Sequence, residues 1–464
     1  MDALAVAPLL PPVVAPLKAA SSILHSPGSP PLLGCVARLA HIVWDGTVES
    51  FGTIADHLRE RLGPRGAEPF ATPLDGKVCI VTGGNAGIGF ATARALARRG
   101  AHVVLACRDR ERAQAAAEAI ARTPPLPGCC GTPSPSPSPS PPAPPPPLSV
   151  EALPLDLGRM ASVRAFAADW RRGGRRLDLI VCNAGVMGPP RRLETADGLE
   201  VQFQVNFLSH WLLANQLLQI EHERRQRAKA APPPSAAAAS KQLPLGATAG
   251  GAGSALPLSA RAGGPHSPSP SAGLEAEGPG QEGEEEEAVR VVMVSSLTHR
   301  AGALQWGDKQ SKNRYEPFLS YGLSKLANTL TARELQRRFD RSPQHRGYTA
   351  VAVHPGLVST ALANGFFTGV GTGWAADWRA PLRPLAESAT ECFGRLLGPL
   401  LMRTPDQSAT IMLAACLGPR GAVAGRYLAL GTPTRPDEYA EDEGRARELW
   451  AYAQELTGCP PALD

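Results

Sequence analysis

The feature that most constrains the fold is a glycine-rich turn that connects an apolar segment to a helical segment. Residues 77–82, Lys-Val-Cys-Ile-Val-Thr, form a short run rich in β-branched residues, which is typical of a buried strand. Residues 83–89, Gly-Gly-Asn-Ala-Gly-Ile-Gly, follow at once, and a helical pattern continues to Gly100 before a second apolar run at 102–106. Glycines in this order let the backbone turn tightly and approach a pyrophosphate at the start of the helix. The order therefore predicts a dinucleotide-binding βαβ unit.

The end of the second predicted strand indicates which dinucleotide is preferred. The sequence there is Cys107-Arg108-Asp109. Arg108 favours NADP(H) over NAD(H), because a guanidinium can donate two parallel hydrogen bonds to a 2′-phosphate. Asp109 leaves two alternatives open: its carboxylate binds a ribose 2′-hydroxyl, or the residue simply begins the next helix.

Strands and helices alternate through the rest of the chain. Further strands are predicted at 150–157, 177–182, 289–295, 348–354 and 425–430, and further helices at 160–170, at 197–219, around Tyr321 and at 437–456. We predict a single Rossmann-fold domain of the α/β class over residues 74–460, with a doubly wound parallel sheet flanked by helices.

Two low-complexity insertions interrupt this domain. Residues 123–149 are rich in proline and serine, and residues 229–288 are rich in alanine, proline and glycine and end in the acidic run 284–287. Such segments cannot form a packed core, so we predict that both are disordered. The proline-rich insertion is either a ligand for SH3 or WW modules or an unselected loop expansion.

The N-terminal extension, residues 1–73, leaves its role open. The stretch 3–17 is apolar but contains four prolines and is too short to span a membrane as a helix. The extension carries weak signs of a targeting segment. A helical pattern at 35–62 predicts an amphipathic helix, which either lies on a membrane surface or packs on its own domain.

Charge and cysteine usage narrow the classes of function. The net charge of +5, on 47 basic and 42 acidic residues, is too small to indicate nucleic-acid binding. The nine cysteines are scattered and form no C-x-x-C pair, so neither a disulfide framework nor a metal site is indicated. A reducing intracellular compartment, the cytoplasm or an organelle such as the chloroplast or the ER surface, fits this usage.

Tyr321 and Lys325 are candidate catalytic residues. They lie four residues apart in a helical segment and so project from one face. An ammonium beside a phenol favours the phenolate, and we expect it to lower the tyrosine pKa from roughly 10 toward neutrality. Such a tyrosine suits general acid/base work on a carbonyl or an alcohol. Alone, the pair more often marks an exposed helix face, so the catalytic interpretation depends on the other motifs.

Taken in order, the motifs resemble those of the short-chain dehydrogenase/reductase family. They are Thr82-Gly83-x-x-x-Gly87-Ile88-Gly89, Asp156, Asn183-Ala184-Gly185, Asn206, Ser296, Tyr321-x-x-x-Lys325 and Pro355-Gly356. Segments 107–109, 197–200, 295–299, 324–328 and 354–356 resemble the subgroup that contains the retinol dehydrogenases, the WW-domain oxidoreductase and chloroplast reductases. The resemblance covers nearly all of residues 74–460 outside the insertions.

The resemblance implies a role for each matching residue. Tyr321 would be the general acid/base, Lys325 would lower its pKa and bind the nicotinamide ribose, and Ser296 would hydrogen-bond the substrate oxygen. Asn206 would hold a water that connects Lys325 to solvent. The cofactor cleft would be lined by Gly83, Asn85, Gly87, Ile88, Gly89, Arg108, Asp156, Leu157, Asn183, Ala184, Gly185, Tyr321, Lys325, Pro355, Gly356, Val358 and Thr360.

The predicted function is hydride transfer between NADP(H) and the carbonyl or alcohol group of an apolar, lipid-like or retinoid-like substrate. Residues 362–403 take the place of the family's substrate loop, and their Phe and Trp residues either contact such a substrate or cap the domain's own core. The resemblance also makes a homodimer through the helices of Asn206 and Tyr321 an expectation. The alternative is a non-enzymatic, NADP(H)-responsive interaction or scaffold protein that binds partners through the two insertions.

Overall fold

An eight-stranded sheet lies at the centre of the residues that the computed structural model describes, which are 53, 70, 72–127, 129, 147–230, 288–358 and 402–459. The strands are β1 (Val78–Thr82), β2 (His102–Cys107), β3 (Val150–Pro154), β4 (Leu179–Cys182), β5 (Arg290–Val294), β6 (Thr349–His354), β7 (Tyr427–Ala429) and β8 (Thr432–Thr434). Their spatial order is β3-β2-β1-β4-β5-β6-β7-β8. Neighbouring strands are parallel except for β7 and β8.

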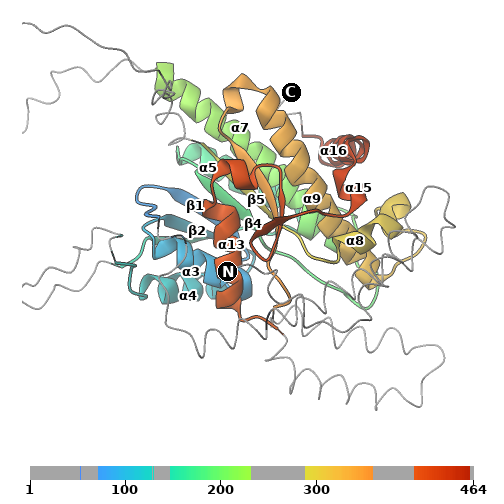
Figure 1. Ribbon diagram of the computed structural model, residues 1–464, viewed down its shortest axis with the longest axis horizontal. Helices are drawn as coiled ribbons and strands as arrows, with labels where there is room; N and C mark the ends of the chain where they lie inside the picture. The colour runs from blue at the N-terminus through green and yellow to red at the C-terminus, as the bar shows by residue number, and fades with distance from the viewer. Residues whose placement is uncertain are drawn as a thin grey trace, which may run out of the picture.

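Helices cover both faces of this sheet (Figure 1). One apolar core contains residues of α5 (Met160–Arg172), α7 (Ser209–Ala230), α9 (Pro317–Arg341) and α16 (Glu443–Thr457). The other contains residues of α3 (Gly87–Ala97), α4 (Arg110–Ala121) and α13 (Pro405–Leu417). Strands buried on both faces explain why the predicted strands are continuous apolar runs. The predicted doubly wound α/β fold is confirmed.

The strand order reverses at β1, and this reversal locates the ligand site. β1 pairs with β2 on one side, where Thr82 lies opposite Ala106, and with β4 on the other, where Val81 lies opposite Val181. Connections leave the carboxyl ends of β1 and β4 in opposite directions, so a crevice opens between them. The glycine-rich turn follows β1, and residues 183–186 follow β4, so both segments border this crevice.

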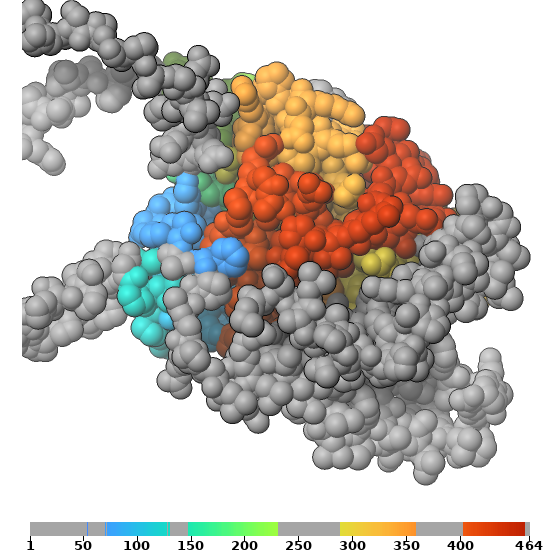
Figure 2. All heavy atoms as spheres, in the orientation of Figure 1, coloured from blue at the N-terminus to red at the C-terminus, as the bar shows by residue number. Residues whose placement is uncertain are grey.

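The C-terminal helix α16 packs across α7 and α9. Trp450 meets Trp211 of α7 edge to face with ring centroids 5.1 Å apart, and the guanidinium carbon of Arg338 in α9 lies 4.3 Å from the Trp450 ring centroid. Figure 2 shows residues 402–459, in red, as a band across one face of the molecule, beside residues of α9 in orange. The sides of α7 and α9 that contact α16 are therefore covered within one chain, and a dimer through these helices would have to use other sides of them.

Several predicted element boundaries were wrong. β3 ends at Pro154 because its partner β2 ends at Cys107, so Asp156 and Leu157 lie in the loop that follows. The helix predicted from residue 197 begins at α6 (Val201–Phe203), since Gly198 has a positive φ of 75° and Glu200 caps the helix through two backbone N–H groups. The antiparallel strand β8 was not predicted. The last helix is divided into α15 (Glu438–Glu441) and α16, which Asp442 caps.

Other predictions concern residues outside the described ranges. These are the amphipathic helix at 35–62, most of the N-terminal extension 1–73, most of the insertions 123–149 and 229–288, Thr360 and nearly all of the loop 362–403. They stay predictions. In the described part of the chain, no helix combines the length and the apolarity that a membrane crossing requires.

Candidate active site

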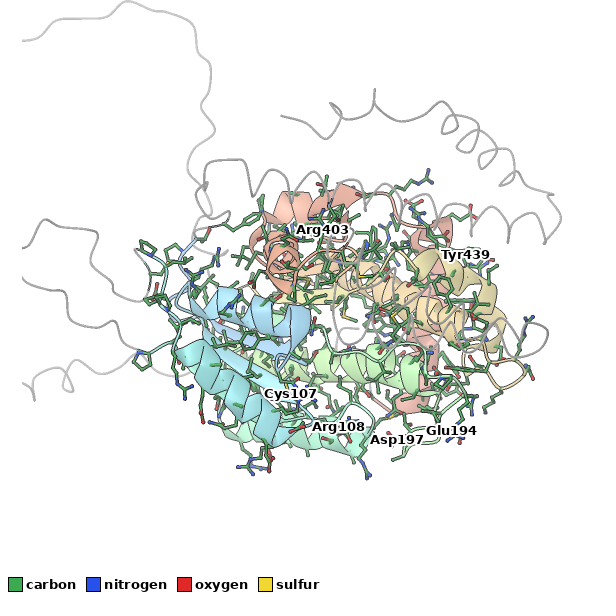
Figure 3. The ribbon with its side chains drawn as sticks, turned by 90° about the horizontal axis from the view of Figure 1, so that it is seen from below. Cys107, Arg108, Glu194, Asp197, Arg403 and Tyr439 are labelled. Carbon is green, nitrogen blue, oxygen red and sulfur yellow. The ribbon has the colours of Figure 1, made fainter. Side chains whose placement is uncertain are left out.

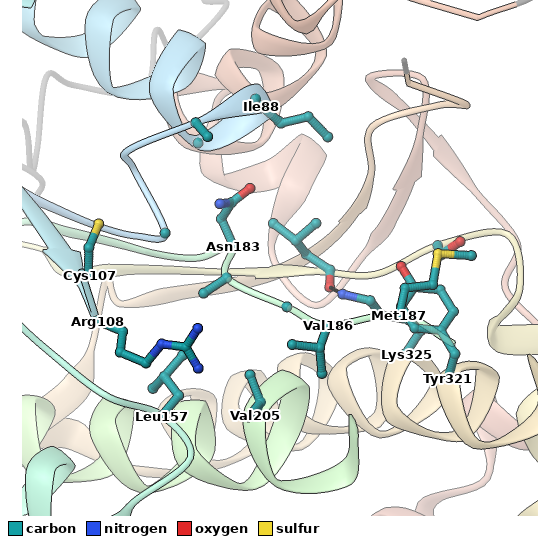
Figure 4. Close-up of a pocket in the computed structure, with 18 of the residues that line it drawn as sticks. Ile88, Cys107, Arg108, Leu157, Asn183, Val186, Met187, Val205, Tyr321 and Lys325 are labelled. Carbon is teal, nitrogen blue, oxygen red and sulfur yellow. Dashed lines mark hydrogen bonds between the residues drawn. The ribbon is translucent and has the colours of Figure 1, made fainter. Parts of the chain in front are cut away.

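A cleft of about 850 Å³ opens at the carboxyl ends of the central strands and collects nearly all of the predicted site residues (Figure 4). Its lining includes Gly83, Asn85, Gly87, Ile88, Gly89, Arg108, Asp156, Leu157, Asn183, Ala184, Gly185, Ser296, Tyr321, Lys325, Pro355, Gly356 and Val358. Figure 4 shows Arg108 at one end and Tyr321 with Lys325 at the other. Asn206 lies beneath the lining, and Thr360 is outside the described residues.

The glycine-rich turn leaves room for a ligand at the start of α3. Gly83 and Gly87 have positive φ values of 64° and 56°, which only glycine adopts without strain. A Cβ at Gly89 would lie 2.5 Å from the Gly83 carbonyl oxygen, so a larger residue there would open the turn. Ala86, at the N-cap, provides no side-chain acceptor for the first N–H groups of α3. These donors and the helix dipole suit a pyrophosphate.

Three guanidinium groups also line the cleft. Arg108 follows β2 (Figure 3). Arg112 and Arg159 are the other two arginines that line the cleft. Asp109 accepts a hydrogen bond from the Arg112 backbone N–H at 3.0 Å and caps α4, so it does begin the next helix. Arg112 and Arg159 were not among the predicted site residues. Their only sequence signal is a position near the start of a helix that follows a strand, which many surface arginines share.

Thr82 and His210 hold the two loops of the crevice together. The Thr82 hydroxyl accepts hydrogen bonds from the backbone N–H groups of Asn183 and Ala184, at 2.9 and 3.0 Å. His210, which is fully buried, lies between the Thr82 hydroxyl, 2.8 Å from Nε2, and the Asn206 carbonyl oxygen, 3.0 Å from Nδ1. A carbonyl can only accept, so Nδ1 carries a proton. Burial lowers the pKa of His210, so the ring is neutral near pH 7 and Nε2 is free to accept from the Thr82 hydroxyl.

Asn206 lies in a π-helical turn (Gln204–Leu208), and its polar groups form hydrogen bonds with other groups of the protein. Its side chain accepts from the Val186 N–H at 2.7 Å and donates to the Val186 carbonyl and to Ser324 Oγ, both at 2.9 Å. The backbone carbonyl oxygen of Asn206 accepts hydrogen bonds from the side chains of His210 and Asn328. Asn206 therefore fixes the segment after β4 against α9. Its role as a water ligand stays a prediction.

Tyr321 and Lys325 both reach the cleft from α9 (Figure 4). Lys325 Nζ donates to the Val294 carbonyl oxygen at 3.0 Å and lies 5.4 Å from the Tyr321 ring centroid. Burial raises the pKa of Tyr321 and lowers the pKa of Lys325 to about 8. The expected lowering of the tyrosine pKa is wrong for this structure, because burial removes the water that would stabilise the phenolate.

Ser296 lies two residues beyond β5, in a turn that orients its hydroxyl group. Ser296 Oγ is 3.3 Å from the Thr298 backbone N–H, which donates to it. The Ser296 hydroxyl hydrogen remains for an acceptor in the cleft. This turn leads into α8 (His299–Gly302), which meets α9 at a contact between Gly302 and Gly322.

Apolar side chains surround the Tyr321 end of the cleft. Figure 4 shows Met187 beside Tyr321 and Lys325, and Leu297, Phe318 and Leu357 also line the cleft. The buried side chain of Gln202 joins two of these walls, because it accepts from the Gly188 N–H at 2.8 Å and donates to the Pro317 carbonyl at 3.2 Å. This end of the cleft therefore suits an apolar ligand.

Two buried histidines make the stability of the fold sensitive to acid. Burial lowers the pKa of His210 to about 4 and that of His299 to about 3. As pH falls below the usual histidine value of about 6.5, the unfolded chain takes up protons that the native state does not, so the free energy of unfolding decreases. We expect a loss of about 2 kcal/mol per histidine between about pH 7 and about pH 5.

Urea unfolding at a series of pH values measures this effect. His210→Gln removes one titrating group and leaves the carboxylates unchanged, so its free energy of unfolding should depend less on pH than that of the wild type. Equal pH dependence of the two proteins would contradict the prediction.

The chain is similar to known dehydrogenases over most of its length. The family model for short chain dehydrogenase matches residues 77–126. Polyprenol dehydrogenase from Mus musculus is 33% identical over 393 residues, which are 84% of this chain and 86% of that protein. Retinol dehydrogenase 13 from Homo sapiens is 31% identical over 396 residues, 85% of this chain and 88% of that protein.

A crystal structure of an uncharacterized protein from Mycobacterium paratuberculosis is 24% identical, with a TM-score of 0.48, and the match covers 84% of this chain and 96% of that one. With its doubly wound sheet and its similarity to the polyprenol and retinol dehydrogenases, the chain belongs to the short-chain dehydrogenase family and is an oxidoreductase of the retinol and polyprenol dehydrogenase type.

Proposed function

We propose that the protein transfers a hydride between NADP(H) and the carbonyl or alcohol group of an apolar substrate, with Tyr321 as the general acid/base. One observation carries the proposal. Tyr321, Lys325 and Ser296 line the same cleft as the glycine-rich turn and Arg108. A nicotinamide dinucleotide bound in this cleft would supply the hydride.

The described residues fit the phosphates of NADP(H). The uncapped N-terminus of α3 would bind the pyrophosphate, and Asp156 would lie at the adenine. Arg108 would bind the 2′-phosphate, and Arg112 and Arg159, which line the same cleft, add positive charge that favours this anion. Asp109 is engaged in capping α4, which leaves Arg108 as the better placed residue at the ribose.

The protein's own residues would handle the proton and orient the substrate. Because burial raises its pKa, Tyr321 is a protonated phenol near neutral pH and would donate to the oxygen of a carbonyl as that oxygen gains charge. The Ser296 hydroxyl, oriented by the Thr298 N–H, would donate to the same oxygen. Lys325, anchored on the Val294 carbonyl, would bind the ribose of the cofactor.

The walls near Tyr321 support an apolar substrate. Met187, Leu297 and Phe318 would exclude water around the reacting carbon and pack against hydrocarbon. Two relatives are named for polyprenol and retinol, which are isoprenoid primary alcohols. We propose that this chain acts on an isoprenoid alcohol or the corresponding aldehyde.

Arg108→Gln should separate the two cofactors. Loss of a charge-assisted contact to the 2′-phosphate is expected to raise the dissociation constant of NADPH by about 10- to 100-fold and to leave that of NADH nearly unchanged. Titration of the nicotinamide fluorescence measures both constants. Arg110→Gln is the matched control, because Arg110 carries the same charge two residues away and does not line the cleft. Equal weakening of NADPH and NADH would refute the assignment of Arg108.

A substrate panel tests the function itself. Retinaldehyde and isoprenoid aldehydes of increasing length, with NADPH, should be reduced faster than short polar aldehydes, and the corresponding alcohols should be oxidised with NADP⁺. If no apolar aldehyde or alcohol is turned over, the proposal fails. The scaffold alternative depends on the two insertions, of which the structure describes only the ends, and no described contact favours it.

A further inference from the structure

We propose that His299 is a positioning residue that holds the Ser296 turn in its reactive geometry by connecting it to the C-terminal segment at Asp437. The inference rests on the proposed role of Ser296. His299 lies at the start of α8 and does not line the cleft, so it would act through Ser296 rather than on the substrate.

Three hydrogen bonds define the Ser296 turn. The backbone N–H of Thr298 donates to Ser296 Oγ at 3.3 Å, and the backbone N–H of His299 donates to the Ser296 carbonyl oxygen at 3.1 Å. The third and shortest bond comes from the imidazole, whose Nδ1 lies 2.7 Å from the same carbonyl oxygen. The imidazole thus restrains the peptide group of a residue that lines the cleft.

The second ring nitrogen reaches a distant part of the chain. His299 Nε2 accepts from the backbone N–H of Asp437 at 3.0 Å, and the ring packs against Tyr427 of β7 with centroids 4.8 Å apart. Because Nε2 accepts from an N–H group and Nδ1 faces a carbonyl, only the neutral imidazole with a proton on Nδ1 satisfies both partners. The His299 side chain is fully buried, so water cannot replace either partner without a rearrangement.

The segment that His299 contacts also packs on the helix of Tyr321. Asp437 caps α15 through the Tyr439 N–H at 3.0 Å, and α15 and α16 both contact α9. The same C-terminal segment therefore contacts both the Ser296 turn, through His299, and the helix that carries Tyr321. A shift of about 1 Å between two groups that act on one oxygen can lower a rate about 100-fold. A purely structural histidine would instead lower stability without a specific effect on Ser296.

A double-mutant cycle with Ser296 distinguishes the two roles. His299→Asn places an amide nitrogen near the position of Nδ1 and keeps the bond to Ser296, whereas His299→Gln extends toward Nε2 and loses it. We expect His299→Gln to lower kcat for aldehyde reduction by about 10- to 100-fold, and His299→Asn to lower it less, with the NADPH dissociation constant unchanged in both. In a Ser296→Ala background, His299→Gln should have little further effect on kcat, because the group that it positions is gone.

Substitutions at Asp437 test the hydrogen bond from the Asp437 backbone N–H to His299 Nε2 without changing His299. Asp437 has a φ of −62°, which proline adopts, so Asp437→Pro removes the N–H that His299 accepts from. Asp437→Ala is the control, because it loses the same carboxylate cap and keeps the N–H. We expect kcat to be about tenfold lower in the proline variant than in the alanine variant.

Two results would overturn the inference. One is equal kcat for Asp437→Pro and Asp437→Ala. The other is an effect of His299→Gln on kcat that is as large without the Ser296 hydroxyl as with it. Failure of the proposed function would look different, because the wild type would then turn over no aldehyde or would be unaffected by Ser296→Ala.

Discussion

Tyr321→Phe is expected to lower kcat for aldehyde reduction by about 100- to 10,000-fold, the usual contribution of a positioned acid/base. The change removes one hydroxyl group and keeps the ring, which is 7% exposed and lies beside the Lys325 ammonium. No other phenol among the described residues lines the cleft. The cofactor contacts at the glycine-rich turn and at Arg108 are untouched, so the dissociation constant of NADPH should change little.

Tyr348→Phe is the matched control for this experiment. Tyr348 is also buried, at 2% exposure, but it precedes β6 and so lies at the amino end of the sheet, opposite the cleft. Steady-state reduction of an isoprenoid aldehyde measures kcat in both variants, and nicotinamide fluorescence measures NADPH binding. A Tyr321→Phe protein that retains the wild-type kcat, or that loses no more than Tyr348→Phe, would rule out Tyr321 as the acid.

Gly322→Ala is expected to impair both stability and catalysis. A Cβ at Gly322 would lie 2.7 Å from the Thr298 carbonyl oxygen and 3.0 Å from the Gly302 nitrogen, both backbone atoms that no side-chain rotation can move. Either α8 or α9 has to shift. Overpacking of this kind costs about 1–3 kcal/mol. Because α8 follows Ser296 and Gly322 follows Tyr321, the shift should also lower kcat by about 100-fold.

Gly307→Ala provides the control for the glycine contact. A Cβ at Gly307, in the neighbouring 3-10 helix (Ala303–Asp308), would have no atom within 4 Å, so both stability and kcat should remain close to those of the wild type. Urea unfolding and steady-state kinetics of the two variants measure the difference. If Gly322→Ala is as stable and as active as Gly307→Ala, the close contact between α8 and α9 does not set the geometry of the site.

The sequence signals that place residues at the cleft are local. Strand, glycine-rich turn and helix follow one another at 77–100, and parallel strands bring their carboxyl ends to one edge whatever lies between them. Residues as distant in sequence as Arg108 and Tyr321 therefore line one cleft.

The remaining features depend on tertiary contacts that a sequence does not display. The pKa of Tyr321 is set by burial, and the buried His210 and His299 become structural links only when their partners, Thr82 and Asp437, are brought to them. Nothing in the local sequence distinguishes Arg112 from other arginines on the surface of a helix. Position 206 was correctly placed in a helical region, but no local pattern indicated a π-helical turn there.

Transfer of deuterium from the cofactor tests the central proposal most directly. The wild-type protein is incubated with NADPH deuterated at both C4 positions and with an isoprenoid aldehyde, and the alcohol is analysed by mass spectrometry. We predict an alcohol that carries one deuterium on its carbinol carbon, formed by the wild type and by Tyr348→Phe and nearly absent with Tyr321→Phe. If the wild type binds NADPH but forms no deuterated alcohol from any aldehyde of the panel, the protein does not catalyse the proposed reaction.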